Sequence, residues 1–245
     1  MIEDMSTLAV ITGTTRGIGA AVLAAAKDAG ATTASVNRRS LGEAGELIVD
    51  LSKPDSWTAF ATWLDTTVQQ HEPDRMVAIH NAATINPIGT AGSVDLDAYT
   101  EHVLANAGAP MVLGAAIVGV AERHELPTRL MQISSGASIT PFPGWSGYCA
   151  SKAAVDQWTA VVGAEQTQAG GPVEVLSIAP GVVDTGMQAD IRESTEAQFS
   201  NIDRFKEMKS NGQLSDPEQV GAKLWRIASE SSWPNGARAD ITEFA

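Results

Sequence analysis

The sequence predicts a single α/β domain built on a doubly wound parallel β-sheet. Short runs rich in Val, Ile, Leu and Thr alternate with longer helical stretches along the chain. Repeated strand, helix, strand units imply a parallel sheet, and right-handed crossovers place helices on both of its faces. No internal repeat and no Pro-, Gly- or Ser-rich linker divides the chain, so residues 1–245 are expected to form one domain.

The expected elements follow from where the apolar runs begin and end. Strands are expected at residues 7–11, 32–36, 46–49, 76–80, 129–134 and 173–179. Helices are expected at residues 18–29, 54–70, 98–122 and 148–168. The region from Pro180 to about Ser215 is expected to be irregular, and loops of that length are usually functional. Another helix is expected to begin at "SDPEQV", because Ser215 or Asp216 can cap it and Pro217 suits its first turn.

Composition argues against several classes of protein. A formal net charge of −13 disfavours nucleic-acid binding, which depends on many Lys and Arg. The single cysteine, Cys149, permits no intramolecular disulfide and the opening "MIEDMS" is acidic, so we expect a cytoplasmic protein. The longest apolar run, residues 111–121, is shorter than the roughly 20 residues of a membrane span. We expect neither membrane insertion nor a metal site.

A glycine-rich turn follows the first expected strand. In "TGTTRGIG", residues 12–19, Gly13, Gly17 and Gly19 permit a tight turn, close approach of a pyrophosphate and close packing of the next helix. The N-terminus of that helix favours an anion. The spacing differs from the usual Gly-x-Gly-x-x-Gly, so the turn alone is a weak signal. Its place at the first βα junction favours a dinucleotide site. The remaining contacts expected from this turn are Thr15, Arg16 and Ile18.

The end of the second strand bears on the choice between NAD and NADP. A carboxylate there would bind the adenosine ribose and repel a 2′-phosphate, whereas an arginine would accept it. The chain has Asn37 at the expected acidic position, followed by Arg38 and Arg39, and Arg16 adds another guanidinium. Arginine suits phosphate because its planar group donates two parallel hydrogen bonds. We expect NADP(H), with Arg38 as the leading contact; for Arg39 a solvated surface position is the alternative.

The stretch "GWSGYCASKAAVDQW", residues 144–158, carries a phenol and an ammonium one helical turn apart. Tyr148 and Lys152 share a helix face because residues four apart do. An unperturbed phenol has a pKa near 10, and a nearby cation favours the phenolate and moves that pKa toward neutrality. Such a pair alone is more often a surface pair, so the assignment depends on its neighbours in the sequence.

Five motifs in order resemble the short-chain dehydrogenase/reductase family over essentially the whole chain: "TGTTRGIG", "HNAA", "ISS", "YCASK" and "PGVVDT". More narrowly, "HNAATINPIG", "GWSGYCASK" and "PGVVDTGMQADIRES" resemble its bacterial sepiapterin-reductase-like branch, which includes benzil reductase. The resemblance implies a Rossmann-like fold and an NADPH-dependent carbonyl reductase, formally reversible as an alcohol dehydrogenase. The alternatives are an NAD-dependent alcohol dehydrogenase of another substrate class and a non-catalytic, dinucleotide-sensing regulator.

The resemblance also implies roles for individual residues. The equivalent of Tyr148 gives its proton to the substrate carbonyl oxygen, and the equivalent of Lys152 holds the nicotinamide ribose and tunes the tyrosine. Ser135, thirteen residues before Tyr148, orients the carbonyl, while neighbouring Ser134 matches a mainly structural serine. Asn106, in "VLANAG", anchors a water linked to the lysine, or else it is a capping or core amide.

Further cofactor contacts are implied beside three strand ends. Asp50 touches the adenine edge or serves as a turn carboxylate, and His80 is interpreted as a strand-end histidine. The remaining implied cofactor contacts are Leu51, Asn81, Ala82, Pro180, Gly181, Val183 and Thr185.

Aromatic and apolar residues near Tyr148 indicate a substrate class. Trp145, Phe142 and Met187 would form a wall that favours flat, apolar ketones over charged metabolites. The resemblance points the same way, to an aryl 1,2-diketone reduced at one carbonyl to a hydroxyketone. The alternative is that Trp145 is a structural plug. Three further apolar residues either form a substrate lid or hold the loop down: Phe199, Ile202 and Phe205.

Assembly is the last expectation. The helices at residues 98–122 and 148–168 are rich in small residues. In the family that the chain resembles, these helices pair across a two-fold axis into a four-helix interface. The resemblance therefore implies a homodimer or homotetramer.

Overall fold

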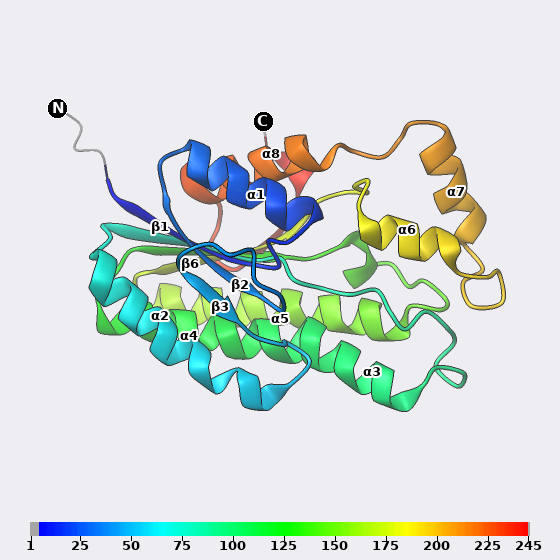
Figure 1. Ribbon diagram of the computed structural model, residues 1–245, viewed down its shortest axis with the longest axis horizontal. Coiled ribbons are helices and arrows are strands. Elements are labelled where there is room, and N and C mark those ends of the chain that lie inside the picture. Colours follow the sequence, from blue (N-terminus) through cyan, green and yellow to red (C-terminus); the bar gives the residue numbers. More distant parts are fainter. Residues whose placement is uncertain (1–4, 245) are drawn as a thin grey trace.

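The computed structural model describes residues 5–244, which contain a seven-stranded sheet covered by helices on both faces (Figure 1). The strand order is β3-β2-β1-β4-β5-β6-β7, and all neighbours are parallel. The strands are β1 (Thr7–Thr12), β2 (Thr32–Asn37), β3 (Glu46–Ile48), β4 (Arg75–His80), β5 (Thr128–Ile133), β6 (Val173–Ala179) and β7 (Ala237–Asp240). The strand order reverses direction between β1 and β4. Ligands of such sheets bind at the carboxyl edge beside that point.

The helices form two layers. They are α1 (Gly17–Asp28), α2 (Thr58–His71), α3 (Leu96–Val103), α4 (Ala109–Arg123), α5 (Ser146–Ala169), α6 (Gly186–Glu193), α7 (Ile202–Ser210) and α8 (Pro217–Glu230). In Figure 1, α2, α4 and α5 lie along the bottom of the sheet, α1 and α8 lie above it, and α6 and α7 extend beyond one end. The doubly wound fold predicted from the alternating pattern is confirmed.

Two separate apolar cores explain why the strands are almost continuously hydrophobic. On β1, Leu8 and Val10 belong to the core under α2 and α4, while Ala9 and Ile11 belong to the core under α1 and α8. Successive side chains point to opposite faces, so a strand buried on both faces needs apolar residues at every position. This is the signal by which the sequence predicted the central strands.

The sequence expectations were wrong for the region that follows β6 and for the end of the chain. The region between Pro180 and Ser215 contains α6 and α7, and β7 adds a seventh strand. Both helices are short and rich in charged residues, and β7 reads "ARAD", which has no apolar run. Their structure depends on packing against distant residues, which local patterns do not report.

The helix expected at residues 98–122 consists of three parts. A π-helical turn, Leu104–Gly108, joins α3 to α4. Pro110 has no N–H to donate to the carbonyl of Asn106, which relaxes the α-helical pattern locally. The turn buries Asn106 completely. Such turns are frequent at functional sites.

The continuous helical stretch from Leu96 to Arg123 is long and apolar enough to cross a membrane, with 28 residues and a mean hydropathy of 1.9 in its most apolar window. The prediction of no membrane insertion rests on the shorter apolar run at residues 111–121, which is part of this longer stretch. Core helices of water-soluble proteins pass the same test, and 44% of this window is buried inside the molecule. Leu113, Ile117 and Val120 of α4 pack in the core against the sheet, so we interpret the stretch as a core helix.

Candidate active site

The glycine turn between β1 and α1 has the geometry that a pyrophosphate requires. Gly13 and Gly17 have left-handed backbones, with φ of +74° and +57°. A Cβ on Gly19 would lie 2.1 Å from the carbonyl oxygen of Gly13. No side chain caps the N-terminus of α1, and its first turn holds no acidic residue. The helix N-terminus therefore offers its backbone N–H groups and positive dipole end to an anion.

Two asparagines hold this turn in place. The Oδ1 of Asn37 accepts hydrogen bonds from the backbone N–H of Thr14 at 2.8 Å and from its hydroxyl at 3.1 Å. The Nδ2 of Asn81 donates to the carbonyls of Thr12 and Gly13, both at 3.2 Å. The sequence predicts a cofactor contact at Asn37, and the structure shows that its buried amide is bonded inside the turn.

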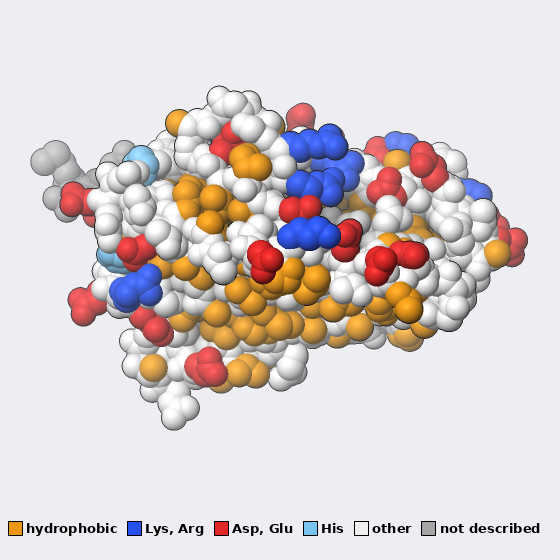
Figure 2. All heavy atoms as spheres, turned by 60° about the horizontal axis from the view of Figure 1, so that its bottom comes forward, with side chains coloured by type: hydrophobic (Ala, Val, Ile, Leu, Met, Phe, Trp, Pro, Cys, Tyr) orange, Lys and Arg blue, Asp and Glu red, His pale blue; other side chains and the backbone are white. Residues whose placement is uncertain are grey.

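Arginines lie on both sides of the turn. Arg38 is exposed directly after β2, and the Arg16 guanidinium packs beside Gly186 at the start of α6. Burial disfavours the charge on Asp50, but hydrogen bonds from Ser52 and the charge of Arg38 outweigh it and lower the pKa of that carboxyl. Asp50 is thus a turn carboxylate bonded to Ser52. Figure 2 shows Lys and Arg gathered near the middle of one face, beside several acidic side chains.

The loop after β6 approaches the same turn. Val183 pairs with Ser215 in an isolated bridge, which fixes the backbone after Pro180 and Gly181. The methyl carbon of Thr185 would lie 3.2 Å from a Cβ placed on Gly17. The residues predicted around the cofactor phosphates therefore meet at the carboxyl edge of β1 and β6. Four other predicted contacts lie at the ends of β3 and β4 or in the glycine turn: Leu51, Ala82, Thr15 and Ile18.

Ser135, Tyr148 and Lys152 come together at the carboxyl edge of β5. Ser135 lies two residues after the end of β5, and Tyr148 and Lys152 occupy the first two turns of α5. A hydrogen bond joins the Ser135 and Tyr148 side chains. The Nζ of Lys152 donates to the carbonyl of Ile133 at 2.7 Å and lies 5.8 Å from the centroid of the Tyr148 ring. The structure thus assembles the three residues that the motifs singled out.

Burial controls the protonation of this group. Burial raises the pKa of Tyr148 to about 12, against the opposing effect of the hydrogen bond with Ser135. Burial also lowers the pKa of Lys152 to about 8, against the opposing charge of Asp156. The sequence predicts that Lys152 lowers the pKa of Tyr148 toward neutrality, but in this structure desolvation is the largest influence on the phenol and raises its pKa. At pH 7 the phenol keeps its proton, so it is available as an acid.

Asn106 joins the π-helical turn to the loop after β4. Its Nδ2 donates to the carbonyl of Thr84 at 2.6 Å, and its Oδ1 accepts from the backbone N–H of Thr84 at 2.9 Å. His102 lies 3.1 Å from the same Nδ2 and bonds the carbonyl of Asn86 at 2.8 Å. The pKa of His102 is lowered by burial. Sequence reasoning missed His102; its spacing of four from Asn106 was the signal that could have indicated it.

The predicted pocket wall differs from the one observed. Trp145 is only 5% exposed, and it belongs to a closed apolar cluster with Phe199 and Phe205, against which Phe142 and Met187 pack. Apolar rings exclude water best by covering one another. The rings therefore form a core between α5 and the α6–α7 segment, and the sequence alternative of a structural plug describes Trp145 well.

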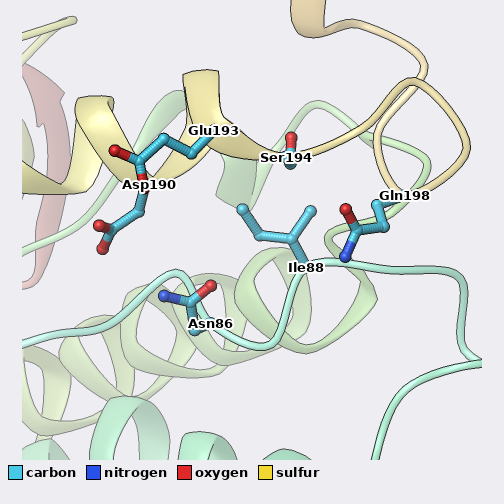
Figure 3. Close-up of a pocket in the computed structure, with 6 residues that line it drawn as sticks. All are labelled: Asn86, Ile88, Asp190, Glu193, Ser194 and Gln198. Atoms are coloured by element: carbon cyan, nitrogen blue, oxygen red, sulfur yellow. The ribbon is translucent and has the colours of Figure 1, made fainter.

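A cavity of about 230 Å³ lies beside this cluster. Its lining is mainly polar and comprises Asn86, Ile88, Asp190, Glu193, Ser194 and Gln198. Figure 3 shows Asp190 pointing from α6 toward Asn86, and Ile88 pointing from the same loop as Asn86 toward the α6 side of the cavity. None of these residues is predicted from the sequence. The carboxylates of Asp190 and Glu193 stand at positions i and i+3 of α6, and this pattern is recognisable only when the helix is known.

A family model for the short chain dehydrogenase matches residues 7–196. The chain belongs to this family. Short-chain dehydrogenases are NAD(P)-dependent oxidoreductases, and the chain is an enzyme that interconverts C=O and CH–OH groups. The glycine turn and the uncapped N-terminus of α1 fit such a dinucleotide.

Benzil reductases that form (S)-benzoin are similar over nearly the full length. The protein from Bacillus subtilis (strain 168) is 32% identical over 244 residues, covering 97% of this chain and 99% of the relative. The protein from Bacillus cereus is 30% identical over 245 residues, covering 96% and 98%. The crystal structure of the KRED1-Pglu enzyme aligns with a TM-score of 0.81 at 28% identity, covering 95% of this chain and 100% of that one.

Proposed function

We propose that this short-chain dehydrogenase is a cytoplasmic, NADPH-dependent reductase of neutral 1,2-diketones, aryl diketones among them, that yields hydroxyketones. The observation that carries the proposal is the convergence of Ser135, Tyr148 and Lys152 at the same edge of the sheet as the glycine turn. A regulator that only sensed a dinucleotide would need no such group. The similarity to benzil reductases over nearly the full chain supports the diketone class.

The side chains divide the work of carbonyl reduction. When bound, NADPH supplies the hydride. Ser135 donates a hydrogen bond to the substrate carbonyl oxygen and orients it, and Tyr148 gives that oxygen the proton held at its Oη. The ammonium of Lys152 stabilises the phenolate that remains and binds the ribose of the nicotinamide. Asn106 holds the loop after β4 and, through it, one wall of the site.

The preference for NADPH rests on the charges beside the adenine end of the site. Neither of the residues that follow β2 is acidic, and Asn37 cannot repel a phosphate. The exposed Arg38 can donate charged hydrogen bonds to a 2′-phosphate, and Arg16 in the glycine turn can add positive charge.

The preference for neutral substrates rests on the cavity beside α6. Asp190 and Glu193 line it, and no ion pair is found for either within residues 5–244. An anionic keto acid would meet two like charges there, whereas a neutral diketone would not. Ile88 supplies the apolar part of the cavity lining.

We also propose that the enzyme is at least a homodimer. Val112 of α4 and Val161 of α5 are exposed, at 47% and 46%. Figure 2 shows a continuous band of hydrophobic side chains along the helical layer that forms the bottom of Figure 1. A contiguous apolar band of this kind is typical of an interface between subunits.

The test is NADPH oxidation followed by absorbance with benzil, 1-phenyl-1,2-propanedione, a pterin ketone and an α-keto acid. The expected result is preference for the neutral diketones and a hydroxyketone product. In Asp190→Asn and Glu193→Gln the relative activity on the keto acid should rise several-fold. Preference of the wild type for the keto acid would overturn the substrate class, and inactivity on every carbonyl would overturn the reductase assignment.

A further inference from the structure

Three buried polar side chains lie on one face of β4 and β5 at their carboxyl ends. His80, Gln132 and Ser134 are 5%, 1% and 2% exposed. Within the described part of the chain, His80 Nε2, Gln132 Oε1 and Ser134 Oγ have no hydrogen-bond partner. His80 and Gln132 are direct partners in the strand register, and Ser134 follows Gln132 by two residues on the same face. We call these three residues the buried polar layer.

The buried polar layer faces the helices that carry the active site. The Nε2 of Gln132 donates to the carbonyl of Pro110 in α4 at 3.3 Å, which places the layer on the α4 and α5 side of the sheet. Lys152, from α5, donates to the carbonyl of Ile133. That carbonyl belongs to the residue between Gln132 and Ser134. The lysine ammonium therefore ends against the layer.

The unpartnered atoms suit small polar ligands. Buried polar groups in native proteins are almost always hydrogen-bonded, and ordered water supplies the partner where the protein does not. A buried water needs two to four polar partners. The layer offers three, and the ammonium of Lys152 has three donors, of which the Ile133 carbonyl takes one. A water here can accept from the lysine and donate to Gln132 Oε1.

We propose that His80, Gln132 and Ser134 hold buried water against Lys152 and so act as positioning residues that complete the hydrogen bonds of its ammonium. The inference rests on the proposed function only where Lys152 is said to act in turnover. His80 thereby gains a role, although its buried ring, whose pKa burial lowers to about 3, stays neutral and is not a proton donor at physiological pH.

Other groups around Lys152 also influence its charge and must be separated from the layer. The titratable and charged groups that face it or its partners are His80 from β4, His102 from α3, Tyr148 and Asp156 from α5, and Arg238 from β7 through Asp156. Apart from His80, whose ring is neutral, none of these belongs to β4 or β5. Substitutions within the layer therefore leave this set of charges intact and change only the hydrogen bonds on the sheet side.

The experiment is a pH titration of the Lys152 side chain by ¹⁵N-lysine NMR in the cofactor-free protein. The signal is assigned by its loss in Lys152→Met. His80→Leu and Gln132→Leu should each lower the pKa of Lys152 by about one unit, because an ammonium that loses a hydrogen-bonded water is harder to keep charged. His80→Asn keeps a polar group at the layer and should restore most of the wild-type value.

Thr128→Val is the matched control, because it removes a buried hydroxyl from the same strand and face at the opposite end of β5. It should lower the melting temperature without moving the pKa of Lys152. If the leucine variants do not fold, Ser134→Ala decides: a lowered pKa supports the inference, and an unchanged one overturns it. An unchanged pKa in folded leucine variants overturns it as well, as does a water-free layer in a high-resolution crystal structure.

A second readout is the alkaline limb of the kcat/KM profile with NADPH and benzil. In the leucine variants this limb should move to lower pH by the same amount as the NMR titration. The NMR result stands even if the enzyme reduces none of the carbonyls offered. Failure of the proposed function and failure of this inference are therefore distinguishable.

Discussion

Trp145 stacks on Phe199 with ring centroids 4.4 Å apart and 8° between the ring planes. Trp145 lies immediately before α5, and Phe199 lies between α6 and α7. Close backbone packing reinforces the contact, because a Cβ on Gly144 would lie 2.3 Å from the carbonyl oxygen of Gln198. The α6–α7 segment is thus packed against the start of α5, the helix that carries Tyr148.

Loosening this contact should alter substrate binding more than chemistry. Phe199→Leu keeps an apolar side chain but removes the stacked ring, at a cost of about 1 to 2 kcal/mol in stability. We expect KM for a diketone to rise several-fold while kcat changes less, because the segment lines the cavity but does not contact the reacting atoms. Phe60→Leu is the control, because Phe60 is equally buried but belongs to the separate core under α2 and α4. Equal KM values in the two variants would refute the role of the contact.

Removing the phenol should abolish turnover without loss of the cofactor. Tyr148→Phe keeps the ring in its apolar cluster but removes the transferable proton, so kcat should fall by about 10²- to 10⁴-fold. NADPH affinity, followed by nicotinamide fluorescence, should stay close to that of the wild type. Tyr99→Phe changes the only other tyrosine, and its kcat should stay close to that of the wild type. Near-normal turnover of Tyr148→Phe at every pH would contradict the assignment.

Arg38→Asp should reverse the cofactor preference. The substitution removes a phosphate partner and adds a repelling charge, which should shift the ratio of kcat/KM for NADPH and NADH by about 2 to 4 kcal/mol. Arg39→Asp makes the same change of charge one residue later and should shift the ratio less. A wild type that uses both cofactors equally well would mean that Arg38 only faces solvent.

His80 should make the protein sensitive to acid. The folded-state pKa of about 3 lies below the ordinary value of 6.5, so between these values the unfolded chain binds more protons than the folded one. Stability is therefore fully present above pH 6.5 and is lost as pH falls, by about 2 kcal/mol at pH 5. In urea unfolding at pH 7 and pH 5, the free energy of unfolding of His80→Asn should fall less between the two pH values than that of the wild type. His71→Asn, at an exposed position on α2, should behave like the wild type.

The exposed valines should govern assembly. Light scattering of the wild type should give at least twice the mass of the 25.6 kDa chain. Val112→Glu with Val161→Glu should yield the monomer, because two charges buried in an apolar interface without partners are strongly unfavourable. Ile48→Glu, an exposed apolar position on β3, should leave the mass unchanged. A wild type that is monomeric at micromolar concentration would rule out the dimer.

Local geometry explains which parts of the site could be predicted. Tyr148 and Lys152 share a face because of the helical repeat, and the glycine turn follows from its spacing after a buried strand. The contact between Asn106 and Thr84 could not be predicted in this way. Their separation of 22 residues spans a loop and a helix, and no local pattern specifies which carbonyl a buried amide will meet.

The doubly wound sheet, the glycine turn and the shared helix face of Tyr148 and Lys152 follow from the sequence, because each depends on short-range periodicity and on residue types with strong backbone or chemical preferences. Tertiary packing was needed to show where the side chains of Asn37 and Trp145 lie, that α6 and α7 form, and that the pKa of Tyr148 is raised. The physical reason is that burial and hydrogen-bond partners come from residues distant in the chain, and desolvation depends on how all of them pack together.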